Sequence, residues 1–177
     1  WSSDVCSSDL DEMSMLAVKD SMYYHFDEWF SRFQREINRL KSVVPSLENR
    51  VELMKFHFNY AGLLGELCHT LAFTSKYQDD KIAEKFLYHS RQVKNLAHDV
   101  LDDNSVTESQ EAQANLFLGA SEGYIGIFEY GQGNLIEALI NGFQADNHLE
   151  KALLLNPKLV DAYFGLGMYR YGNSRLG

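Results

Sequence analysis

The chain has 177 residues, of which 45% are apolar and 13% aromatic, and it contains only two prolines. This composition excludes a disordered chain and predicts a mainly helical domain or a few units of a repeat array. The net charge of -9 argues against nucleic acid and acidic membranes as partners, because both carry negative charge themselves.

The first ten residues, WSSDVCSSDL, differ in character from the rest of the chain. They lack an initiating Met, repeat Ser-Ser-Asp and resemble translated adapter sequence, so we expect residues 1–10 to be non-native. Residues 11–177 are then predicted to form one helical domain that is incomplete at both ends. Without the native N-terminus, the compartment of this soluble domain stays open between cytoplasm and periplasm.

Two long helices are predicted in the first part of the chain. Apolar residues recur every three or four positions over residues 16–44, which indicates an amphipathic helix that Pro45 ends. A second helix is predicted over residues 47–73. Charged residues such as Glu52 and Lys55 interrupt it, so it is a buried helix with apolar contacts on two sides and not a membrane span.

Two more helices follow a polar turn. The turn at residues 75–80 precedes a third helix over residues 81–101. Ser105 followed by Glu108 has the spacing of a capping box, which predicts that a fourth helix begins there and covers residues 108–130.

The fourth helix carries Gly119, Gly123 and Gly126 along one stripe. Each glycine costs about 1 kcal/mol relative to alanine in a helix interior. Three of them on one side therefore predict the close approach of a neighbouring helix.

The segment GQGN, residues 131–134, ends the fourth helix, and its Asn together with Glu137 is expected to cap a fifth helix. That helix covers residues 135–155. Pro157 stops it, and a sixth helix begins at Leu159.

A Leu-Gly pair recurs in the second, fourth and sixth helices, with its glycine at Gly65, Gly119 and Gly167. The intervals are 54 and 48 residues, since 119 − 65 = 54 and 167 − 119 = 48. A motif at similar but unequal spacing predicts stacked helical hairpins.

Around the last Leu-Gly pair the chain resembles the tetratricopeptide repeat family. The family's signature has small residues in the second helix of a hairpin, Pro at the turn, and an aromatic residue followed by Leu-Gly in the next helix. These stand at Ala145, Ala152, Pro157, Tyr163, Leu166 and Gly167. The resemblance implies an all-α, right-handed superhelical solenoid of about three helix-turn-helix repeats, with helices longer than those of the 34-residue unit.

The resemblance also implies that the first helix of each hairpin lines a concave face that binds a peptide or partner protein. Counting from each Leu-Gly pair assigns to this face Asn59, Glu66, His69 and Thr70, then Gln113, Leu116 and Tyr124, then Asp161, Phe164, Met168 and Tyr171. For any one of these residues, and for Leu116 and Phe164 especially, a place in the core is an equal alternative.

None of these residues is Lys or Arg, which argues against the carboxylate clamp of the family's chaperone-binding members. An aromatic, weakly acidic groove favours an extended apolar or basic segment instead, or the neighbouring subunits of an assembly. The chain is therefore predicted to be a non-catalytic interaction or scaffold module.

An enzymatic alternative rests on the dipeptide His98-Asp99 with His69 upstream, which suggests a metal-dependent phosphohydrolase of the all-helical His-Asp type. Against it, His89 and His98 are nine residues apart and lie on opposite sides of one helix, so they cannot ligate one ion. A solvated helix end also favours a histidine there.

No metal site, cofactor or catalytic residue is predicted. His25, His57 and His148 have no partners at a useful spacing. The GQGN segment follows no strand and precedes no Lys-Ser or Lys-Thr, so it is not a phosphate-binding loop. A third interpretation is purely structural: the chain is one segment of a longer solenoid and self-associates through its missing repeats.

Overall fold

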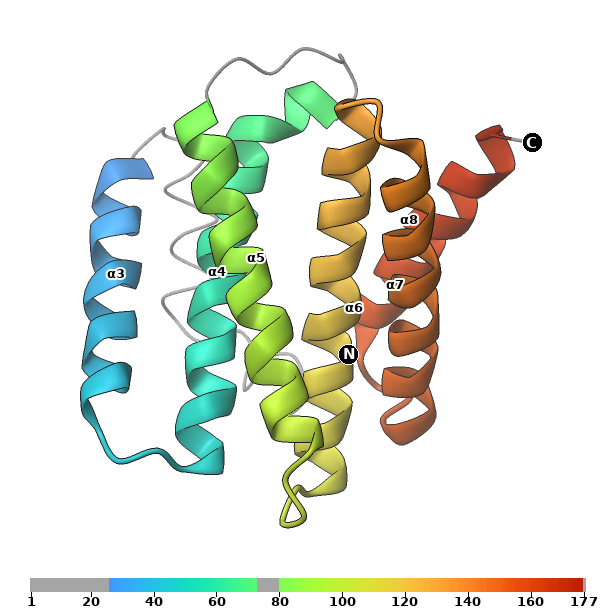
Figure 1. The fold of residues 1–177 in the computed structure, drawn as a ribbon. Helices are drawn as coiled ribbons and strands as arrows, with labels where there is room; N and C mark the ends of the chain where they lie inside the picture. The colour runs from blue at the N-terminus through green and yellow to red at the C-terminus, as the bar shows by residue number, and fades with distance from the viewer. Residues whose placement is uncertain (1–25, 73–79, 177) are drawn as a thin grey trace.

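The structure, a computed structural model, describes residues 26–72 and 80–176. These residues form the helices α3 (Phe26–Ser42), α4 (Leu47–Ala72), α5 (Asp80–Leu101), α6 (Glu108–Gly131), α7 (Leu135–Leu155) and α8 (Val160–Leu176) (Figure 1). The predicted all-α class is confirmed, and the described part contains no strand. Each predicted helix boundary within it is at most two residues from the observed one.

Some predictions lie outside the described residues. They concern the non-native first ten residues, the first helix before residue 26, and the turn that precedes α5. Within the described part, no helix is long and apolar enough to cross a membrane.

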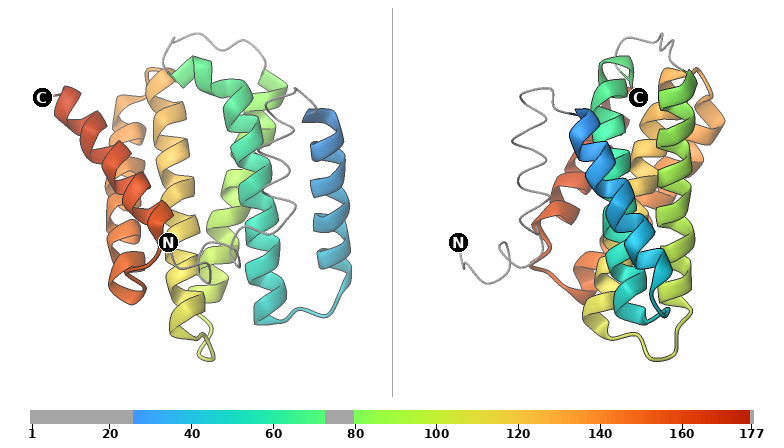
Figure 2. Two further views of the ribbon diagram at one scale, coloured as in Figure 1. Left: turned by 180° about the vertical axis from the view of Figure 1, so that it is seen from behind. Right: turned by 90° about the vertical axis from the view of Figure 1, so that its left-hand side faces the viewer.

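The helices from α4 to α8 lie in two layers. Helices α4, α6 and α8 form one layer and α5 and α7 the other, as Figure 1 and the two views of Figure 2 show. Helix α4 packs against α5, and α6 packs against α7, so each pair is an antiparallel hairpin. Helix α6 also contacts α4, α5 and α8, which joins one hairpin to the next.

Three clusters of buried apolar side chains hold these helices together. Each cluster draws on three consecutive helices, from α3–α5 to α4–α6 to α6–α8. Their central members are Trp29, Phe33 and Phe86, then Met54, Val93 and Leu118, then Leu116, Leu149 and Leu166. The core is therefore continuous along the stack.

The glycine stripe of α6 makes room for α7, as predicted. A Cβ atom on Gly119 would lie 2.9 Å from Leu149 Cγ, and one on Gly126 would lie 3.2 Å from the carbonyl oxygen of Ala138. Gly123 is looser, because a Cβ there would lie 3.8 Å from Ala145 Cβ. The close approach is confirmed at two of the three glycines.

Helix α6 begins where predicted, but its cap differs from the prediction, which gave the capping box to Ser105 and Glu108. Thr107 is the N-cap: its Oγ1 accepts a hydrogen bond from the Gln110 N–H at 3.3 Å, and Gln110 Oε1 accepts one from the Thr107 N–H at 3.0 Å. Ser105 donates its hydroxyl to Asp103 at 2.6 Å instead. Ser105 therefore belongs to the preceding Asx turn, which competes for its side chain.

The predicted cap of α7 is also wrong in detail. Asn134 occupies the N-cap position, but its side chain makes no capping hydrogen bond and donates to the Glu129 carboxylate at 2.7 Å. Gly133 has a φ of 82°, which suits glycine because it lacks a Cβ. The hydrogen bond from Asn134 to Glu129, near the end of α6, thus stabilises this turn in place of the predicted cap with Glu137.

We expect Thr107→Ala to lower the free energy of unfolding by about 1 kcal/mol, because the Gln110 N–H then loses its acceptor. Ser105→Ala is the matched control and should have a smaller effect, since it leaves the helix start intact. Urea denaturation measures both. An equal or larger loss for Ser105→Ala would contradict the capping assignment.

Candidate partner-binding surface

The residues assigned to the concave face belong to the layer of α4, α6 and α8 (Figure 2). Phe58 of α4 connects the first two helices of this layer. Its ring stacks on Tyr124 of α6 with centroids 5.7 Å apart, and it lies 5.1 Å from the ring of Phe117. Helices α4 and α6 therefore share an aromatic surface in which Tyr124 is exposed.

Helix α8 carries a second apolar surface. Phe164 is 72% exposed, Tyr171 59% and Met168 43%. At 100° per residue these three side chains lie on one side of α8, together with the exposed Asp161. We call the side chains of Phe58, Asn59, Gln113, Phe117, Tyr124, Ile127, Asp161, Phe164, Met168 and Tyr171 the α4–α6–α8 face.

The predicted members of this face differ in accessibility. Asn59 and Gln113 are half-buried, whereas Tyr124 and the three predicted residues of α8 are exposed. The side chains of Glu66, His69 and Thr70 lie outside the described part of the chain.

Leu116 and Phe164, the two residues for which a place in the core was the strongest alternative, differ in their burial. Leu116 is 8% exposed and belongs to the core cluster that includes Leu149 and Leu166. Phe164 is on the surface. Leu116 is therefore a packing residue, because its side of α6 faces the neighbouring helices.

Sequence reasoning missed Phe58, Phe117 and Ile127. Phe117, Tyr124 and Ile127 are separated by seven and three residues, which is the spacing of one helical stripe, so this signal could have found two of them. Phe58 gives no such signal, because its place depends on how α4 packs against α6.

The residues of the repeat signature lie mostly at joints between helices. Ala145 and Ala152 are buried on α7, and Leu166 is buried on α8. Pro157 lies in the turn between α7 and α8. Tyr163 is different, because its ring is 55% exposed.

A histidine pair is buried between α4 and α5. His57 and His89 are 0% and 4% exposed, and their Nδ1 atoms lie 2.8 Å apart, so the N–H of one ring donates a hydrogen bond to the nitrogen of the other. Burial, with the positive charges of Lys41 and Lys85 nearby, lowers the pKa of His89 to about 4. Burial, with the charges of protonated His89 and of Lys41, lowers the pKa of His57 to about 3. Both rings are therefore neutral near pH 7.

The sequence offered His57 no partner at a useful spacing, and it did not indicate this contact. The partner is 32 residues away on another helix, and sequence spacing along one helix cannot reveal such a contact. Both histidine rings contact tyrosines: Tyr60 stacks on His89 with centroids 3.9 Å apart, and Tyr88 meets His57 edge-on.

The contacts of His148 were likewise not indicated by sequence spacing, because this residue joins a polar group between α5, α6 and α7. Glu122 is 2% exposed and lies 3.2 Å from Lys94 Nζ and 3.9 Å from His148 Nε2. Burial raises the pKa of Glu122, and the Lys94 ammonium opposes that rise. His148 Nδ1 lies 3.0 Å from Asn115 Oδ1. The two contacts of His148 join α7 to α6, and the Lys94–Glu122 pair joins α5 to α6.

The described residues contain no group of three or more His, Cys, Asp or Glu side chains that could hold a metal ion. His89 faces His57 in the interior, whereas His98 and Asp99 are exposed on α5. The side chain of His69 lies outside the described part. Within that part, the dipeptide that suggested a phosphohydrolase is not drawn into a metal-binding cluster.

No family model matches the chain, and neither the curated proteins nor the solved structures yield a match.

Proposed function

We propose that the chain is a tetratricopeptide-repeat-like interaction module that binds a peptide or partner protein on the α4–α6–α8 face. The observation that carries this proposal is the exposure of aromatic and apolar side chains on helices of the same layer, Tyr124 on α6 and Phe164, Met168 and Tyr171 on α8. Exposed apolar side chains gathered on one surface of a protein are typical of interaction sites. The right-handed superhelical course of the array is part of the same proposal.

The ligand that suits this face is an extended segment with apolar and basic residues. Aromatic rings such as Tyr124 and Tyr171 can bury apolar side chains of a ligand at little cost in conformational entropy. Asp161 is exposed beside the apolar side chains of α8, and the whole chain carries a net charge of -9. Both features favour positive charge on the ligand.

A peptide selected from a random library against the folded protein should lose about tenfold in affinity when Tyr124 or Tyr171 is changed to Ala, because each removes an aromatic contact. Fluorescence anisotropy with the labelled peptide measures the loss. Tyr130→Ala is the matched control: Tyr130 is 47% exposed on α6, but lies about 120° around the helix from Tyr124. Unchanged affinity in both Tyr124→Ala and Tyr171→Ala would remove the assignment of the face.

A further inference from the structure

The ring of Tyr124, which contributes to the proposed binding face, lies against an aromatic ring from another helix. Phe58 of α4 stacks on it with the ring planes 15° apart and the centroids 5.7 Å apart. Tyr124 is 41% exposed, whereas Phe58 is half-buried. Tyr124 is therefore the outer member of the pair, and Phe58 is the member nearer to the core.

Phe58 is itself held in place by the core. Its ring lies 5.1 Å from the ring of Phe117 on α6, at an angle of 59°. Both phenylalanines pack against the buried cluster that contains Met54 of α4 and Val93 of α5. Rings in such a tilted arrangement attract each other beyond the apolar area that they bury. The packing of α4 against α5 and α6 thus fixes Phe58, and Tyr124 stacks on a ring that is already ordered.

This contact restricts the side chain of Tyr124. A tyrosine on a helix has two common χ1 rotamers, at about 180° and about −60°, and an exposed one loses this freedom when it binds a ligand. The stack with Phe58 favours one rotamer before binding. Because less conformational entropy is then lost on binding, a pre-organised side chain of this kind raises the affinity.

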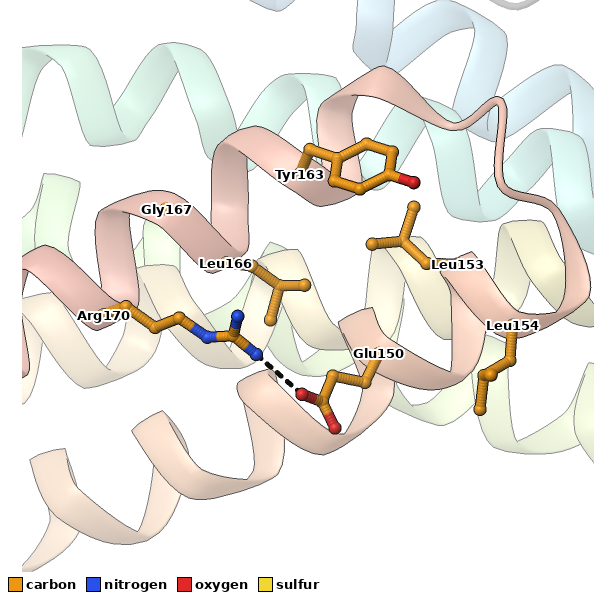
Figure 3. A pocket seen from close by; sticks show the side chains of 7 residues that line it. All are labelled: Glu150, Leu153, Leu154, Tyr163, Leu166, Gly167 and Arg170. Atoms are coloured by element: carbon orange, nitrogen blue, oxygen red, sulfur yellow. Dashed lines mark hydrogen bonds and ion pairs between the residues drawn. The ribbon is translucent and has the colours of Figure 1, made fainter.

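Tyr163 of α8 provides a contrast. It is 55% exposed and lies at the groove between α7 and α8, beside Leu153 (Figure 3). The other residues that line this groove are aliphatic, small or charged, such as Arg170 with its ion pair to Glu150, so none of them offers a ring to stack on. Exposure alone therefore does not fix the orientation of a tyrosine, whereas the ring from α4 does so for Tyr124.

The stack also crosses the joint between two helical hairpins. Phe58 belongs to the hairpin of α4 and α5, and Tyr124 belongs to the hairpin of α6 and α7. A change in the packing of α4 on α6 would move one ring relative to the other. The orientation of Tyr124 therefore depends on how the two hairpins pack against each other.

We propose that Phe58 is a positioning residue of the binding face, which acts on ligand affinity through Tyr124 by holding its ring in the orientation that contacts the ligand. Because Tyr124 belongs to the proposed face, this role of Phe58 rests on the proposed function. The ligand binds the stacked orientation of the tyrosine, and Phe58 contributes to the affinity from the neighbouring hairpin without touching the ligand.

A double-mutant cycle with the labelled, library-selected peptide tests this role. Phe58→Leu keeps an apolar side chain but removes the ring, and it should weaken binding about fivefold in fluorescence anisotropy. In the Tyr124→Ala background, the same substitution should change the affinity by less than about twofold, because no ring remains to be positioned. Phe58→Tyr keeps a ring that can stack, so its affinity should stay within about twofold of that of the original chain.

Tyrosine labelled with ¹³C gives a second readout, which a merely structural role would not change. The ring of Phe58 shifts the ring-proton resonances of Tyr124, so Phe58→Leu should remove this shift and Phe58→Tyr should retain it. Tyr124→Phe identifies the resonances. Circular dichroism verifies that each variant folds, and Phe58→Met serves as a second variant without a ring.

Phe128→Leu is the matched control. Phe128 is also half-buried on α6, and its ring lies 5.5 Å from that of Phe86, but neither residue belongs to the binding face. The peptide affinity should therefore stay within about twofold. A loss for Phe128→Leu as large as that for Phe58→Leu would overturn the positioning role. So would an equal loss for Phe58→Leu with and without Tyr124.

The proposed function and the role of Phe58 fail in distinguishable ways. If Tyr124→Ala weakens binding and Phe58→Leu does not, the face stands and only the positioning role is overturned. If Tyr124→Ala leaves the peptide affinity unchanged, the role of Phe58 is overturned as well, and unchanged affinity in Tyr171→Ala would then remove the face itself.

Discussion

Acidification from pH 7.5 to pH 4.5 is expected to destabilise the fold by several kcal/mol through the His57–His89 pair. The pKa values of about 3 and 4 lie below the 6.5 of an unperturbed histidine. Between these values the unfolded chain binds protons that the folded chain does not. Stability is therefore complete above pH 6.5 and falls as the pH drops toward 4, by up to about 1.4 kcal/mol per pH unit for each histidine.

Urea denaturation at a series of pH values measures this loss. Replacement of the whole pair, His57→Leu with His89→Leu, should flatten the pH dependence, whereas His98→Gln, which leaves the buried pair in place, is the control that should keep the steep loss of stability at low pH. The difference between the two variants separates the buried pair from the carboxylates, which titrate in both. A double variant that keeps the pH slope of the original chain would contradict the assignment.

Gly119→Ala is expected to lower the free energy of unfolding by about 2 kcal/mol, because overpacking at this site exceeds the gain in helix propensity. The added Cβ would lie 2.9 Å from Leu149 Cγ and 3.0 Å from the backbone oxygen of Ala145. Since a backbone atom cannot rotate away as a side chain can, α7 itself would have to shift. Thermal and urea unfolding measure the loss.

Gly123→Ala, one helical turn further along α6, is the matched control. Its Cβ would lie 3.8 Å from Ala145 Cβ, which is an ordinary contact. The substitution should therefore stabilise the protein by up to about 1 kcal/mol through helix propensity. If both substitutions changed stability in the same direction, the close approach of α7 at Gly119 would be contradicted.

The sequence predicted the helices because their signals are local. Trp29, Phe33 and Ile37 recur at helical spacing and are all buried. Pro157 falls in the observed turn between α7 and α8. The glycine stripe of α6 was informative for the same reason, since glycines that cost helix propensity indicate a neighbour close by.

Which side chains meet between two helices was not predictable in this way. His57 with His89, and Phe58 with Tyr124, each join residues on different helices, and their pairing depends on the packing of α4 against α5 and α6. The prediction of the α6 cap was wrong for a more local reason. Ser105 and Thr107 are both good capping residues, and only the Asx turn of Asp103 decides between them.

The exposure of side chains was the least predictable property of the candidate surfaces. Leu116 and Phe164 had the same two assignments from sequence, yet one is in the core and the other on the surface. The apolar residues Leu135, Leu139 and Phe143 of α7 are also exposed. Burial of an apolar helix side depends on which neighbour covers it, and the helix's own sequence does not specify that neighbour.

Chemical-shift mapping tests the proposed binding face most directly. Two-dimensional ¹H–¹⁵N spectra, recorded while the library-selected peptide is added to the folded protein, should change most at Tyr124, Phe164, Met168 and Tyr171. Amides on the outer sides of α5 and α7, such as those of Tyr88 and Leu154, should change little. The largest changes on α5 and α7, with the α4–α6–α8 face unaffected, would contradict the proposal.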